Sequence, residues 1–150
     1  EAKSIKIAEL SRTCNALITN GVDMEIDGVA EHFSYNDEDQ TNIKELFDIV
    51  MQTNSPMYYH QNNGGCRLYS AEQIINLYVT EVTNKMHHTT YFNQLKMYIK
   101  SLNDIDTVSS VAYGDKLQGI YLETYNNAML RAKESVETLL RNQAAALSNI

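Results

Sequence analysis

The stretch that decides the fold reads VDMEIDGVAEHFSYNDEDQ and runs from Val22 to Gln40. Apolar and acidic residues alternate over its first five positions, which is the period of two expected for a half-buried β-strand. Asp27-Gly28 follows and is a strong hairpin signal, because the turn that joins two strands most tightly needs residues tolerant of positive φ. We therefore predict a β-hairpin whose second strand covers residues 29–35.

The end of the same stretch predicts the start of a helix. Asn36 is a favourable N-cap residue, Asp39 lies three positions later, and acidic residues fill the first turn. Apolar residues at helical spacing then mark one face: Ile43, Leu46, Phe47 and Val50. We expect this helix to end near Gln52, ahead of the single proline at Pro56.

Downstream, the same order of elements is predicted a second time. Residues 57–61 and 66–69 are strand-like, and the Asn- and Gly-rich segment Asn62–Gly65 lies between them as a turn. Ser70 followed by Gln73 has the pattern of a capping box, which marks another helix start. The chain therefore reads hairpin, helix, hairpin, helix.

Long helices are expected on both sides of this centre. Residues 3–20 have an apolar face at helical spacing and end at Asn20-Gly21, a C-terminal stop. The helix that starts after Ser70 keeps helical spacing to Leu102 without a breaker, a length of about 45 Å at 1.5 Å per residue. The β-branched pair Thr89-Thr90 is the place where it could bend.

Two further helices are predicted near the end of the sequence. A short one covers residues 106–113 and ends at Gly114, and a longer one covers residues 119–141. Residues 143–146 carry no further structure signal. The fold class is α+β, with two small β-hairpins packed on a bundle of four or five helices that includes one long central helix. We expect residues 1–150 to form a single domain, the C-terminal part of a longer protein.

The charge and composition of the chain exclude several classes of function. The formal net charge is −7, and the 12 basic residues do not cluster, which argues against binding to nucleic acid or to anionic membranes. No apolar run approaches the ~18 residues of a membrane span. The two cysteines, Cys14 and Cys66, are too few for a disulfide framework, and we interpret them as reduced thiols.

Chemistry-bearing residues are few and poorly spaced for catalysis. None of the four histidines forms the i, i+4 pair of a zinc-binding helix. His60 and Cys66 flank a tight turn, so they could supply two metal ligands or a thiol nucleophile with its base, or simply hydrogen-bond and pack within the hairpin. We predict no metal, no cofactor, no small-molecule substrate and no enzymatic activity, and keep a small Cys/His or zinc enzyme as the third interpretation.

Tyrosine is the unusual feature of the composition, with 10 tyrosines, three phenylalanines and no tryptophan. Tyrosine covers apolar area while keeping a hydroxyl in water, which suits interfaces. One face of the long helix combines aromatic and polar side chains: His87, Tyr91, Gln94 and Tyr98. This face either packs against the last helix through Tyr121 and Tyr125 or forms a surface for another subunit.

Four stretches together resemble a family of phage and prophage domains, chiefly from Gram-positive bacteria. They are Glu31–Ser34 through Asp39-Gln40, Tyr59-His60 through Cys66–Tyr69, His87–Leu95, and Tyr113-Gly114 followed by Tyr121. Members of this family occur among tail-fibre, baseplate-associated and tail-fibre-assembly proteins. The resemblance covers about residues 5–129, and residues 88–95 are its most specific part.

The resemblance implies a setting and no catalytic residues. It implies a non-catalytic structural or interaction module of a phage tail or tail fibre, located in the virion tail, with other tail proteins or further copies of itself as partners. A homotrimer would be in keeping with this setting. The alternative is a chaperone-like tail-fibre assembly factor in the cytoplasm of the bacterial host. The candidate interaction surface takes residues from both halves of the chain: Tyr59, His60, Arg67, His87, Tyr91, Gln94 and Tyr98.

Overall fold

A computed structural model describes residues 1–148, and its helices and strands confirm the predicted α+β class. Five helices and two antiparallel two-stranded sheets are present within these residues. In chain order the elements are α1 (Ala2–Thr19), β1 (Val22–Ile26), β2 (Val29–Phe33), α2 (Asp37–Thr53), β3 (Met57–Tyr59), β4 (Arg67–Tyr69), α3 (Ala71–Ser101), α4 (Ile105–Ser110) and α5 (Gly119–Ser148).

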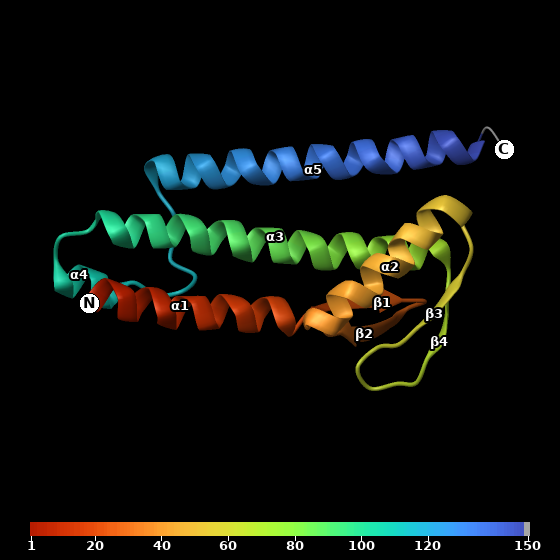
Figure 1. The fold of residues 1–150 in the computed structure, drawn as a ribbon, viewed down its shortest axis with the longest axis horizontal. Helices are drawn as coiled ribbons and strands as arrows, with labels where there is room; N and C mark the ends of the chain where they lie inside the picture. Colours follow the sequence, from red (N-terminus) through yellow and green to blue (C-terminus); the bar gives the residue numbers. More distant parts are fainter. Residues whose placement is uncertain (149–150) are drawn as a thin grey trace.

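The long helix α3 is the axis of the molecule. Figure 1 shows α1 and α5 running along opposite sides of α3, with α2 and both hairpins gathered at one end and α4 at the other. Direct packing joins α3 to α1, to α2 and to α5. The fold is therefore a flat layer of three helices with a compact α+β end, which we call the hairpin end (residues 20–70 and the α3 turns that they cover).

The first hairpin has the turn that the sequence predicts. Ile26 pairs with Val29, and the two residues between them have positive φ angles of 52° and 83° at Asp27 and Gly28. Gly21, which joins α1 to β1, is required for a different reason. A Cβ atom at this position would lie 1.8 Å from the carbonyl oxygen of Phe33, so the two backbone segments can meet only at glycine.

Capping boxes begin both helices that follow a hairpin, which confirms the predicted N-cap at Asn36 and the predicted capping box at Ser70. The Asn36 side chain accepts a hydrogen bond from the Asp39 N–H at 2.9 Å, and the Asp39 carboxylate accepts one from the Asn36 N–H at 3.3 Å. Ser70 and Gln73 make the equivalent reciprocal pair at 3.1 and 2.9 Å. Each pair satisfies two N–H groups at a helix start, which fixes where α2 and α3 begin.

Buried apolar side chains form two clusters, both centred on α3. The larger lies at the hairpin end and includes Phe33, Ile43, Tyr69 and Ile74. The smaller lies where α1, α3 and α4 meet and includes Leu10, Leu95, Ile99 and Val108. Helix α5 contributes no fully buried residue to either cluster, although several of its side chains are half-buried against α3.

Three local expectations need correction. The last helix continues to Ser148 instead of stopping near Arg141, because alanine, which fills residues 144–146, is the best helix former. Helix α3 shows no break at Thr89-Thr90 and is one element of 31 residues. Cys66 is exposed instead of packed inward, whereas Cys14 is buried, and both thiols are free.

Candidate interaction site

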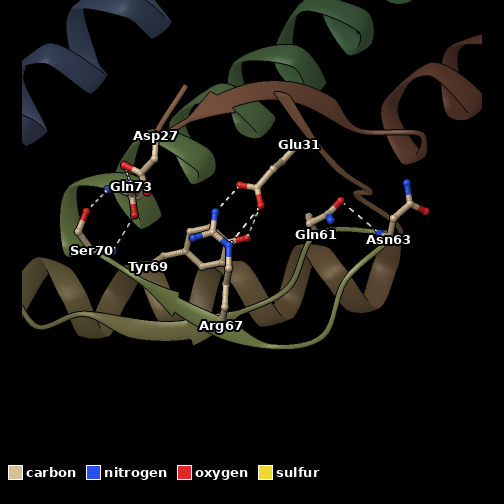
Figure 2. Close-up of polar contacts among 8 residues, drawn as sticks. All are labelled: Asp27, Glu31, Gln61, Asn63, Arg67, Tyr69, Ser70 and Gln73. Carbon is tan, nitrogen blue, oxygen red and sulfur yellow. Dashed lines mark hydrogen bonds and ion pairs between the residues drawn. The ribbon is translucent and has the colours of Figure 1, made fainter. Parts of the chain in front are cut away.

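The two hairpins are joined by a cluster of polar contacts, which we call the clasp (Glu31, Arg67 and Tyr69). Arg67 on β4 donates to both oxygens of Glu31 on β2, from Nη2 at 2.6 Å and from Nε at 3.2 Å. The Tyr69 hydroxyl donates to the same carboxylate at 3.3 Å, and the guanidinium lies 4.2 Å from the Tyr69 ring centroid. Figure 2 shows these side chains converging from the facing hairpins.

Further contacts hold the hairpins in place around the clasp. The Gln73 side chain, at the start of α3, donates to Asp27 in the β1–β2 turn at 3.3 Å, as Figure 2 shows. The Asn62 N–H donates to the His32 carbonyl at 2.9 Å, which ties the β3–β4 loop to β2. The clasp and the Asn62–His32 contact therefore hold the second hairpin against the first, although each of its strands has three residues.

The predicted site residues of this hairpin have different surroundings. Tyr59 is buried, its ring stacks on Phe33 with centroids 6.3 Å apart, and burial together with nearby carboxylates raises the pKa of its phenol. Arg67 is half-exposed and engaged in the clasp. His60 and Cys66 are exposed at opposite ends of the loop. The hairpin therefore holds Tyr59 and Arg67 as structural residues and presents His60 to solvent.

The outer face of the same hairpin carries two apolar side chains that the sequence analysis passed over. Tyr58 and Leu68 are cross-strand partners in the β3–β4 register. They are 65% and 51% exposed, respectively. Side chains alternate between the two faces of a strand, so the pair points away from the core while Tyr59 and Tyr69 point into it. The same alternation in the sequence could have predicted this pair, because Tyr58 and Leu68 fall on the strand face opposite to that of Tyr59 and Tyr69.

The second group of predicted site residues lies between α3, α5 and the segment that joins α4 to α5. His87 hydrogen-bonds Tyr125 on α5, with Nδ1 and Oη 2.5 Å apart. The Tyr98 ring packs edge-on against Tyr121 at a centroid distance of 5.8 Å. These two contacts correspond to the alternative in which this face packs against the last helix.

Tyr91 and Gln94 lie in the same region but differ in burial and in their hydrogen-bond partners. Tyr91 is 9% exposed, its hydroxyl donates to the Asp115 carbonyl at 2.6 Å, and it accepts from the Gly114 N–H at 2.9 Å. It therefore anchors the segment that leads into α5. Gln94 is half-buried and hydrogen-bonds its neighbour Asn93. Burial lowers the pKa of His87, so its imidazole is neutral at physiological pH.

A buried acid, Glu81 on α3, was missed by the sequence analysis. Its side chain is 1% exposed, and neither carboxyl oxygen has a hydrogen-bond partner among the described residues. Burial, and secondarily the charge of the buried Asp39, raises the Glu81 pKa to about 9, so this carboxyl group is protonated at neutral pH. The Tyr35 pKa rises to about 12, through burial and then through Glu81.

One signal could have found Glu81. It lies four residues after Leu77 and seven after Ile74, so it occupies the apolar face of the long helix. An acidic residue on that face is either exposed at the end of the core or buried at a cost. The groove beside it, lined by Tyr35, Lys44, Tyr78 and Lys85, does not include Glu81. Its carboxyl group is therefore enclosed within the fold.

Within residues 1–148, no group of three His, Cys, Asp or Glu side chains could hold a metal ion. A cavity of about 610 Å³ lies beside the start of α5 and is lined by Leu95, Tyr98, Tyr121 and the backbone segment 115–120. Across the same residues, no helix combines the length and the apolar character that a membrane span requires.

The class defined by this geometry is a helix-dominated α+β fold with two small antiparallel sheets. Residues 1–114 match the family model described as "Domain of unknown function (DUF4376)", and the chain belongs to this family. Helix α5 begins after the matched region. No curated protein and no solved structure matches the chain.

Proposed function

We propose that the protein is a non-catalytic structural or interaction module of a phage tail or tail fibre, which acts by binding another virion protein. The observation that carries this proposal is the outer face of the β3–β4 hairpin. An exposed aromatic ring and a leucine lie side by side there, on a platform held by the clasp. Rigid aromatic and apolar side chains are the typical anchors of protein interfaces, because they lose little conformational freedom on binding.

The polar groups of the domain also favour contact over catalysis. The His87 and Tyr91 side chains and the Arg67 guanidinium are engaged with other parts of the same chain. His60 and Cys66 are exposed and flank a loop of Asn and Gly residues. The phage setting comes from the sequence resemblance described above, which supports a virion partner and not a small molecule.

The test uses virions of the phage that encodes the chain. We expect mass spectrometry of purified virions to detect the wild-type protein. Replacing the outer pair (Tyr58→Ser with Leu68→Ser) should release the protein from virions, while its circular dichroism and thermal midpoint stay close to those of the wild type. The control is Ile105→Ser, which removes an equally exposed apolar side chain from α4 at the opposite end of the molecule.

Two results would argue against this proposal. A protein absent from virions that co-purifies with a tail-fibre protein from infected cells would be an assembly factor, the alternative function. A protein found in neither fraction would contradict both functions.

A further inference from the structure

Helix α5 carries a second line of side chains at helical spacing, which shares Leu140 with the side chains that pack toward α3. Taken at alternating steps of four and three, its residues form one line, which we call the seam: Asn126, Leu130, Lys133, Glu137, Leu140, Ala144 and Leu147. This spacing is the heptad pattern by which helices pack along their length. Leu140 and Leu147 are half-buried and the other five are exposed, with Leu130 at 56%.

The seam lies along one edge of an apolar groove between α5 and α3. The groove has a volume of about 470 Å³, and its floor is made by Val79 and Met86 on α3 and by Met129 and Val136 on α5. Lys133, Glu137 and Leu140 of the seam complete its lining. In Figure 1, α5 has α3 as its neighbour on one side and nothing along the other. A further helix could therefore lie on the seam and cover the groove.

The order of residues in the seam indicates what that helix is. When two copies of α5 are placed antiparallel around a two-fold axis at residue 135, residues whose numbers sum to 270 face each other. Leu130 then faces Leu140 of the second copy, and Lys133 faces Glu137 of the second copy. By symmetry each pair occurs twice, which is the self-complementarity that a two-fold interface requires.

The charges of α5 agree with this pairing. Lys133 and Glu137 are exposed, and neither forms an ion pair within the described part of the chain. Helix α5 has three basic and three acidic residues, so its formal charge is zero and the net charge of −7 falls on residues 1–118. Two copies of α5 can therefore approach each other without the repulsion that two copies of the remaining surface would meet.

We propose that α5 is a self-association helix that pairs with α5 of a second copy in an antiparallel, two-fold arrangement centred on residue 135. The contact follows the seam over residues 126–144, a length of about 28 Å at 1.5 Å per residue. It produces a dimer instead of the trimer that the phage resemblance implies. The proposal does not depend on the phage setting, since it rests only on the seam and the charges of α5.

The test measures association of the full 150-residue chain by sedimentation equilibrium from about 1 µM to about 1 mM. The wild type should form a dimer. Lys133→Glu places two acidic residues against each other on each side of the two-fold axis, at the centre of the contact, and Glu137→Lys does the same with two basic residues. Each variant should raise the dimer dissociation constant by about tenfold or more, because two ion pairs are replaced by two repulsions.

An equimolar mixture of the two charge variants distinguishes the antiparallel arrangement of the two α5 helices from a parallel one. In the mixed pair one chain is acidic at both 133 and 137 and the other is basic at both. Opposite charges therefore face each other across the contact, and heterodimers should form with affinity near that of the wild type. Parallel helices would place 133 against 133 and 137 against 137, so the wild type would already have two repulsions. Neither single variant would then weaken the dimer, and the mixture would bind more tightly than the wild type. Arg131→Glu, an exposed charge reversal off the seam, is the control and should leave the dimer unchanged.

A second variant tests the apolar part of the contact. Leu130→Glu should abolish the dimer, whereas Ile120→Glu, at a similarly exposed site off the seam, should not. A wild-type monomer at every concentration, a trimer, or a dimer that resists both Lys133→Glu and Leu130→Glu would overturn the proposal. These outcomes leave the virion test at the hairpin end unaffected, so the two proposals can fail separately.

Discussion

The hairpin end and helix α5 are stabilised in different ways. At the hairpin end, short strands are joined to each other, to α2 and to α3 by apolar burial, by two capping boxes and by the clasp. Helix α5 is 30 residues long, has no fully buried side chain and packs on one neighbour, α3. Its own N–H and C=O groups hydrogen-bond along the helix, so it needs few tertiary contacts to keep its shape, whereas three-residue strands need many.

The comparison shows that the contacts which stabilise the whole domain gather at the hairpin end, whereas the side chains of α5 remain at least partly exposed. A substitution at the hairpin end should change the free energy of unfolding of the whole domain, because its contacts join segments far apart in the chain. A substitution on α5 should act more locally, because no residue of that helix is fully buried in either core. Three predictions test this difference.

The largest effect is expected at Glu81. Between its ordinary pKa of about 4.5 and its folded value of about 9, the folded state holds a proton that the unfolded state has released. The free energy of unfolding must therefore fall as pH rises through this window, by up to about 1.4 kcal/mol per pH unit. Glu81→Gln removes this dependence and should stabilise the domain by about 2–3 kcal/mol at pH 7. Urea titrations from pH 5 to 9 measure both quantities.

The control for this prediction is Glu45→Gln, an exposed acid on α2, which should change stability by less than about 0.5 kcal/mol. A Glu81→Gln protein with the same pH slope as the wild type would show that Glu81 ionises normally in the folded state.

An intermediate effect is expected at the clasp. Arg67→Met keeps much of the side-chain length but leaves the largely buried Glu31 carboxylate without its charged partner. The cost should be about 2 kcal/mol in the free energy of unfolding, measured by urea titration at pH 7. The matched control is Lys44→Met, which breaks the exposed ion pair with Asp48 and should cost about 0.5 kcal/mol or less. Equal effects of the two variants would mean that the clasp contributes no more than a surface ion pair.

The smallest effect is expected on α5. Tyr125→Phe removes the hydroxyl that hydrogen-bonds His87 and should weaken α5 docking by about 1 kcal/mol, without a comparable change at the hairpin end. Amide hydrogen exchange should then be about fivefold faster in the first turns of α5 and unchanged in α2. Tyr121→Phe is the control, because no hydrogen bond of its hydroxyl is present in the described residues. Faster exchange throughout the domain would contradict the local role of this contact.

The element starts were predictable because they are encoded over a few residues. The Asp27-Gly28 turn and the capping residues Asn36 and Ser70 lie where the sequence placed them. The end of α5 was predicted less well, because the alanines that extend it lack a stop signal and an apolar stripe. Among the candidate site residues, Tyr91 is almost fully buried, a property that helical spacing cannot separate from membership of an exposed tyrosine face.

By itself, the sequence determined the class of fold, the order hairpin–helix–hairpin–helix and the length of the central helix. These follow from backbone geometry, from capping and from the period of apolar residues, all of which act between near neighbours. The tertiary structure alone decided that Arg67 meets Glu31, 36 residues away, and that Glu81 is enclosed without a partner. Those outcomes depend on which faces of distant segments pack together, and the energy of that packing belongs to the assembled core and not to any local stretch of chain.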